Sequence, residues 1–169
     1  MPNKKSGFTI IEVVLVLAIA GLIFLMVFVA LPSLQRSQRD TQRKNDLSTL
    51  SSAIVSYSSN NNKLPSDTGT FYTNITSGES GKWSGFIYNY LLGSGNDEFA
   101  GPSMGYYTLE VTKVGSNATA STVLDKIRVG ISASCNSNND GLVHESSDGN
   151  RNFALIIKLE SGGHYCLDN

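Results

Sequence analysis

The sequence predicts an α+β protein in which a long N-terminal helix, transmembrane in its first half, packs on a C-terminal antiparallel β-sheet. Three patterns predict this fold: an uncharged apolar run near the N-terminus, an amphipathic helical stripe after it, and alternating strand patterns in the C-terminal half. The 169 residues suffice for one packed domain beside the apolar run. The formal net charge of −1 argues against a chain that is basic overall, as many nucleic-acid-binding proteins are.

The apolar run covers residues 13–31 and contains nothing more polar than Gly21. As a helix rising about 1.5 Å per residue, it would span roughly 30 Å, the thickness of a bilayer's hydrocarbon core. A cleaved secretory signal is the nearest alternative, but its apolar region is usually about 7–15 residues and ends at a small-residue cleavage site. This run is longer and no such site follows it, so we expect it to remain on the mature protein.

A short basic leader precedes the run, and a single carboxylate opens it. Glu12 is the only charged residue between Lys5 and Arg36. A carboxylate in hydrocarbon costs several kcal/mol unless it finds a partner, so an intramembrane Glu is a functional hypothesis by default. The alternative is a Glu near a helix N-terminus, where the helix macrodipole favours a negative charge.

The segment from Lys4 to Glu12, KKSGFTIIE, followed by an unbroken apolar helix, closely resembles the class III signal peptide of type IV pilins and pseudopilins. The resemblance implies that a membrane prepilin peptidase cuts between Gly7 and Phe8 and methylates the new amine of Phe8. It also implies that Glu12, the fifth residue of the mature chain, pairs with the Phe8 ammonium of a neighbouring subunit during filament assembly. The N-terminal helices would then form the filament core.

The function implied by the resemblance is that of a structural subunit of a type IV pilus, a surface filament used for adhesion, twitching motility or DNA uptake. Its partners would be copies of itself, the prepilin peptidase, the membrane, and the pilus assembly platform with its ATPase. The alternative is a pseudopilin or minor pilin of a type II secretion or competence machine; a membrane-tethered binding module that never polymerises is less favoured. No residue pattern resembles a catalytic constellation, so we expect neither an enzyme nor a cofactor.

The expected location is a single pass of the cytoplasmic membrane, with the C-terminal domain extracytoplasmic, and the cell surface after assembly. The positive-inside rule by itself indicates the opposite orientation, because four basic residues follow the apolar run and two precede it. These are Arg36, Arg39, Arg43 and Lys44 against Lys4 and Lys5. We set the rule aside because the pilin-like leader implies an inside N-terminus and because the two cysteines indicate an oxidising compartment. The three arginines share one helix face, which we interpret as solvated or inter-subunit.

The helix is predicted to continue past the membrane to about Asn60. Leu47, Leu50, Ile54 and Tyr57 recur at spacings of three and four and form one apolar stripe, which we expect to face a sheet. Gly21 and Pro32 are the weak points of this helix. Three asparagines at 60–62 and Pro65 predict its end.

The remaining residues are predicted to form a loop-rich antiparallel sheet, with strands at 106–112, 126–133, 153–160 and 164–167 and a hairpin joining the last two. Residues 71–105 are expected to be loop, with its aromatic residues packed on the core rather than forming a surface cluster: Trp83, Phe86, Tyr88 and Tyr90. The expected segments are therefore a cleaved leader (1–7), a transmembrane and filament-core helix (8–31), its amphipathic continuation (32–63) and a head domain (64–169). From Asn61 onward, seven basic and eleven acidic residues give a net charge of −4, so nucleic acid is an unlikely ligand for the head domain alone.

Two cysteines, Cys135 and Cys166, favour a disulfide outside the cytoplasm, worth roughly 2–4 kcal/mol by loop closure. It would tie the edge of the strand containing Ile127 to the last strand, and it resembles the disulfide-bounded C-terminal region of many pilins. A zinc site made by the two cysteines with His144 and His164 is a rival interpretation, although the spacing matches no compact zinc motif. Disulfide without metal is the interpretation that we favour.

Residues 136–141, NSNNDG, imitate the first half of a calcium loop, but an Asn/Asp/Gly turn accounts for the same residues. The twelfth loop position is Ser147 where calcium requires a Glu, although Glu145 and Asp148 are close in sequence. Both interpretations stay open. Asn74 and Asn117 begin glycosylation sequons by pattern alone.

Overall fold

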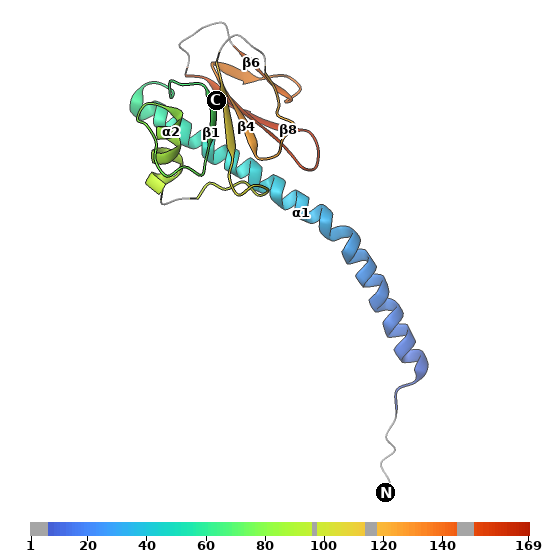
Figure 1. The fold of residues 1–169 in the computed structure, drawn as a ribbon. Coiled ribbons are helices and arrows are strands. Elements are labelled where there is room, and N and C mark those ends of the chain that lie inside the picture. Colours follow the sequence, from blue (N-terminus) through green and yellow to red (C-terminus); the bar gives the residue numbers. More distant parts are fainter. Residues whose placement is uncertain (1–6, 96–97, 114–117, 145–150) are drawn as a thin grey trace. The chain divides into compact units, whose positions relative to one another are not determined.

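A computed structural model describes residues 7–95, 98–113, 118–144 and 151–169. The chain divides into two compact units, Met1–Ser37 and Gln38–Asn169. Helix α1 (Ile10–Asn61) begins in the first unit and ends in the second (Figure 1). We describe each unit by itself.

The first unit is the apolar half of α1. Its large hydrophobic side chains, from Phe8 to Leu34, are exposed. Among the described residues, one helix, α1, is long and apolar enough to cross a membrane. None of the residues in its most apolar 18-residue window is buried against other described residues. The helix is continuous through Gly21 and Pro32, the two predicted weak points. Pro32 still lacks the N–H that would bond the carbonyl of Phe28.

The second half of α1 is amphipathic and is held by the head. Leu47, Leu50, Ile54 and Tyr57 are buried, so the predicted apolar stripe is confirmed. After the helix, Asn62 adopts a left-handed backbone conformation with φ of 55°. Asparagine tolerates this conformation, which ends helices, better than most residues do.

A five-stranded sheet packs against this half of α1, in the order β1-β2-β4-β7-β8 (Figure 1). Its strands are β1 (Gly69–Tyr72), β2 (Thr108–Thr112), β4 (Lys126–Ile131), β7 (Phe153–Lys158) and β8 (His164–Asp168). The α+β fold class is confirmed, and four of these strands fall where alternation predicted them. The sheet is mixed rather than purely antiparallel, because β2 and β4 are parallel. The chain leaves the sheet after β2 and returns to begin β4 at the same end, and such a crossover makes neighbours parallel.

A three-stranded sheet that the sequence did not predict covers part of the other face, in the order β3-β6-β5. Its strands are β3 (Ala118–Thr119), β5 (Ala133–Cys135) and β6 (Gly141–His144). Ala133 and Leu142 pack there on Ala154 and Ile156 of β7. Between β4 and β5, Ser132 has a φ of 53°, and this kink lets one continuous strand pattern change sheets.

Short helices replace part of the predicted loop at residues 71–105. They are α2 (Trp83–Phe86), a π-helical turn (Ile87–Leu91) and a 3₁₀ turn (Gly93–Gly95). Trp83 and Phe86 are fully buried, and Tyr57 of α1 meets the rings of Phe86 and Tyr90 edge-on at 5.7 and 5.0 Å. The expectation that these aromatic residues complete the core is confirmed for Trp83 and Phe86.

Truncating the apolar stripe should destabilise the head in proportion to burial. Leu50→Ala removes a fully buried side chain and should lower the free energy of unfolding by about 2–5 kcal/mol. Val55→Ala, five residues later on the exposed side of the helix, should change it by about 0.5 kcal/mol or less. Urea unfolding followed by fluorescence of Trp83, the single tryptophan, measures both. Equal losses in the two variants would contradict the described packing.

Candidate functional site

The predicted cleavage point lies in exposed, non-helical backbone. Gly7, Phe8 and Thr9 precede the first residue of α1, and the side chain of Phe8 is 90% exposed. A Cβ built on Gly7 would meet no described residue within 4 Å. The leader residues 1–6, with Lys4 and Lys5, lie outside the described residues.

Glu12 forms a capping box with Thr9 at the start of α1. Glu12 Oε2 accepts a hydrogen bond from the Thr9 backbone N–H at 2.8 Å and from the Thr9 hydroxyl at 2.9 Å. In return, the Thr9 hydroxyl oxygen accepts from the Glu12 N–H at 3.4 Å. This reciprocal arrangement satisfies donors that a helix N-terminus otherwise leaves unpaired. The sequence analysis did not identify Thr9, although the spacing Thr-x-x-Glu before an apolar run is the usual signal for such a box.

The Glu12 carboxylate retains an oxygen for another partner. No described residue donates a hydrogen bond to its Oε1. Phe8, Glu12, Val13, Val16 and Leu17 line an open hollow of about 310 Å³, in which Glu12 is the only polar residue. The accessible lining of the hollow is apolar, so the hollow can receive an apolar group, while Glu12 Oε1 remains available to a cation.

Comparison with known proteins finds a match for the N-terminal segment that contains Gly7, Phe8 and Glu12. A family model described as the prokaryotic N-terminal methylation motif matches residues 2–28. The N-terminal segment is a class III signal peptide of type IV pilins and pseudopilins. No curated protein and no solved structure matches the chain. The motif supports a type IV pilin-like or pseudopilin precursor, and the apolar half of α1 fits the membrane anchor of such a precursor.

The chain carries a second cluster of charged groups, where α1 enters the head. Arg43 is fully buried and donates to Asp125 at 3.0 Å, to Glu160 at 3.0 Å and to Asp40 at 3.1 Å. Arg39 donates to both carboxylate oxygens of Glu160, at 2.6–3.0 Å. The interpretation of this helix face as solvated or inter-subunit is wrong for Arg43 and, in part, for Arg39; Arg36 is exposed. The charges of the two arginines are neutralised mainly by Asp125 and Glu160, which are distant from α1 in the sequence.

These contacts shift the carboxylate pKa values downward. Hydrogen bonds from Arg39 and then Arg43 outweigh desolvation and lower the pKa of Glu160 from its usual 4.5. Burial opposes ionisation of Asp40, but hydrogen bonds from Ser161, from the Glu160 backbone and from Arg43 outweigh it, so its pKa also falls below the usual 3.8. Both groups bind protons less readily in the folded chain than in the unfolded chain.

The predicted disulfide is present: Cys135 on β5 is bonded to Cys166 on β8. It joins the small sheet to the edge of the large one, not the edge of β4 as predicted, because the kink at Ser132 separates Cys135 from that strand. With both sulfurs in the disulfide, neither can be a zinc thiolate, so the zinc interpretation is wrong. Among the described residues, no group of three His, Cys, Asp or Glu could hold a metal ion.

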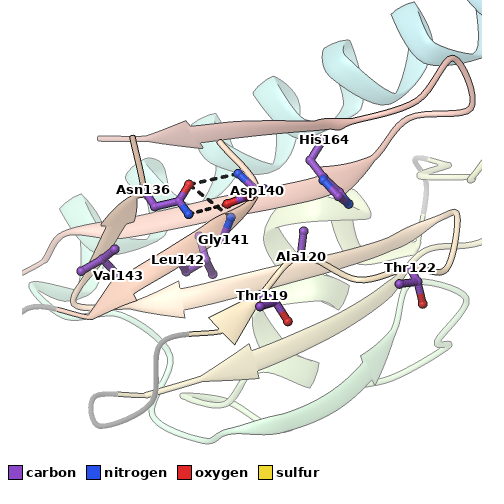
Figure 2. Close-up of a pocket in the computed structure, with 9 residues that line it drawn as sticks. All are labelled: Thr119, Ala120, Thr122, Asn136, Asp140, Gly141, Leu142, Val143 and His164. Atoms are coloured by element: carbon purple, nitrogen blue, oxygen red, sulfur yellow. Dashed lines mark hydrogen bonds between the residues drawn. The ribbon is translucent and has the colours of Figure 1, made fainter. Parts of the chain in front are cut away.

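An open pocket of about 380 Å³ lies between residues of β3, β6 and β8 (Figure 2). It contains the proposed half calcium loop. Asn136 Oδ1 accepts from the backbone N–H groups of Asp140 and Gly141 at 3.0 and 3.3 Å, and its amide donates to Asp140. These oxygens serve their own loop, which favours the Asn/Asp/Gly turn. Glu145, Ser147 and Asp148 lie outside the described residues, as does Asn117 of one sequon; Asn74 of the other is exposed.

Acid should weaken the head through Glu160. A group with a lowered folded-state pKa stabilises the fold above its unfolded pKa, and this contribution is lost as pH falls through the folded value. The thermal midpoint of Glu160→Gln should therefore lie below that of the wild type at about pH 7, and the difference should shrink below about pH 4.5. Trp83 fluorescence during heating at several pH values measures it. A difference that is independent of pH would contradict the ionised pairing of Glu160.

Proposed function

We propose that this chain is a structural subunit of a type IV pilus. Residues 1–7 are a leader that prepilin peptidase removes after Gly7, and Phe8 becomes the N-methylated first residue. The mature chains then polymerise through residues 8–31 into a surface filament. The observation that carries this proposal is the coincidence of a class III signal with an apolar half of α1 whose most apolar window is not buried by any described residue.

Burial supplies the driving force for assembly. Each Å² of apolar surface removed from water contributes about 25 cal/mol, so an uncovered helix of this length cannot stay in water. Before assembly, lipid covers residues 13–31 as a single membrane pass with the head outside the cytoplasm. In the filament, the helices of other copies take the place of the lipid. The pilus assembly platform and its ATPase would drive the transfer.

The Glu12–Phe8 pair supplies register rather than bulk attraction. After cleavage, the ammonium of Phe8 is a charge among apolar helices, and it needs a counter-charge. No described residue donates to Glu12 Oε1, so this oxygen is available to such an ammonium, and the adjoining hollow lined by Phe8, Val13 and Val16 is apolar. A neighbouring subunit is accepted only at the height where its ammonium reaches this oxygen.

Pseudopilins carry the same motif, so the alternative is a short filament of a secretion or competence machine. Deleting the gene for this chain separates the two functions. If the chain is the pilus subunit, electron microscopy of the deleted cells should show no long surface filaments, and expression of the wild-type chain should restore them. Long filaments that persist in the deleted cells would contradict the pilus role and support the pseudopilin role.

Removing the charge of Glu12 should block assembly but spare insertion and cleavage. Glu12→Val makes the membrane helix more apolar, so insertion does not suffer. Each incoming Phe8 ammonium is left unpaired, at several kcal/mol per subunit, so filaments should be almost absent. Filament counts in deleted cells that express the variant measure this, after the mature mass has confirmed cleavage before Phe8.

Thr9→Val is the matched control. It removes the hydroxyl of the capping box, leaves the Glu12 carboxylate in place, and should cost only about 1 kcal/mol. Filaments should therefore form in this variant. If Thr9→Val and Glu12→Val reduced filament numbers equally, Glu12 would act as a helix cap and the pairing mechanism would be wrong.

A further inference from the structure

Four side chains with unused hydrogen-bonding groups line the open pocket of the head that Figure 2 shows. Thr119 ends β3, Thr122 follows it, Asp140 precedes β6, and His164 begins β8. All four belong to the unit Gln38–Asn169. The pocket holds about 380 Å³, which is within the range of small-molecule sites in proteins. It is therefore large enough for one small ligand.

The hydroxyls of Thr119 and Thr122 have no partner among the described residues. By contrast, the exposed hydroxyls of Ser48, Ser52 and Ser56 donate to carbonyl oxygens of their own helix, α1, at 2.9–3.1 Å. A hydroxyl can donate one hydrogen bond and accept others. The two threonines of the pocket keep both capacities for a ligand.

The Asp140 carboxylate is held by its own turn and keeps one oxygen unused. Its Oδ1 accepts from the Asn136 amide, and the Asp140 backbone N–H donates to Asn136 Oδ1 at 3.0 Å. No described residue donates to Asp140 Oδ2. A group that is already held in place loses little conformational freedom when a ligand binds. Oδ2 is therefore a preorganised acceptor at the pocket.

The charges around the pocket favour a neutral ligand. His164 is half-buried, and no described residue bonds to its ring nitrogens. Its partner in the register of β7 and β8, Lys158, donates its amine to the Thr122 carbonyl oxygen at 2.8 Å and does not line the pocket. An anionic ligand would thus meet the Asp140 carboxylate and no lysine or arginine of the described chain. A metal cation would find a single carboxylate, too few ligands to hold it.

Apolar side chains complete the lining. Ala120 and Leu142 belong to the small core under the three-stranded sheet, and the side chain of Val143 is 40% exposed. Small-molecule sites typically combine an apolar lining with a few polar groups that fix the orientation of the ligand. A sugar matches this lining, because its C–H groups can cover apolar side chains while its hydroxyls donate to a carboxylate and exchange hydrogen bonds with threonine and histidine.

We propose that this pocket binds a neutral sugar unit. The hydroxyls of Thr119 and Thr122 and the ring of His164 exchange hydrogen bonds with sugar hydroxyls, and Asp140 Oδ2 accepts from one of them. The apolar lining covers the C–H groups of the sugar. The pocket lies within the head of one chain, so this inference goes beyond the filament function and does not depend on it.

Saturation-transfer NMR of the full-length chain in dodecylphosphocholine micelles tests the proposal, because this detergent contains no sugar. The probes are glucose, galactose, mannose and N-acetylglucosamine, each at millimolar concentration. At least one of them should receive saturation from the protein, and titration of that sugar gives its Kd.

Two variants then test the site. Thr119→Val with Thr122→Val keeps the shape of both side chains and breaks no hydrogen bond to a described residue. Losing two hydrogen bonds to the sugar should weaken binding about tenfold. Asp140→Asn keeps an oxygen for the Asn136 amide but replaces the unused carboxylate oxygen by a donor, and should also raise the Kd. The thermal midpoint from Trp83 fluorescence checks that each variant is folded.

Glu98→Gln is the matched control. Glu98 is exposed and lines a different open pocket of the head, of about 270 Å³. This variant should bind the sugar as the wild type does. Absence of saturation transfer to all four sugars, an unchanged Kd in both pocket variants, or an equal loss of affinity in Glu98→Gln would each overturn the proposal.

Discussion

Among the described residues, nothing buries the apolar half of α1, and the rest of the structure depends on this constraint. The head is already closed: its buried stripe on α1 faces a complete core under the five-stranded sheet. The large apolar side chains before Leu34 are exposed, and none belongs to that core. A packed domain is therefore joined to a helix with an exposed apolar surface, and a surface of this size marks a site of interaction with a membrane or with other proteins.

One helix thus serves two environments, and its sequence changes where the environment changes. Up to Leu34 it is apolar all round, as a helix in lipid or in a filament core must be. From Gln38 it is amphipathic, with the buried pair of Asp40 and Arg43 at its entry to the head and the apolar stripe beyond. The single carboxylate of the apolar half, Glu12, lies at its N-terminal end, where Thr9 already satisfies one oxygen.

Periodicity predicted the parts of the fold in which a local pattern and the final packing agree. The stripe through Leu50 and the strands β2, β4, β7 and β8 belong to this class. The strands β3, β5 and β6 are two to four residues long, too short for alternation to appear. The parallel pairing of β2 with β4 depends on the path of the chain between them, which no pattern within either strand records.

The candidate sites also divide into those that a local sequence pattern reveals and those that depend on residues far apart in the chain. The residues of the class III signal are contiguous, so the sequence alone could single out Gly7, Phe8 and Glu12 as candidate site residues. The capping box of Glu12 with Thr9 could also have been predicted from its spacing. The burial of Arg43 could not, because its partners Asp125 and Glu160 are 82 and 117 residues away and a basic helix face is usually solvated.

The central claim is that this chain, cut before Phe8, builds a filament through its N-terminal helix. Mass spectrometry of filaments sheared from the cell surface tests it most directly. The account predicts that their main protein is this chain, beginning with N-methylated Phe8 and containing the bond between Cys135 and Cys166. Filaments made of another protein, or of this chain still beginning at Met1, would contradict it.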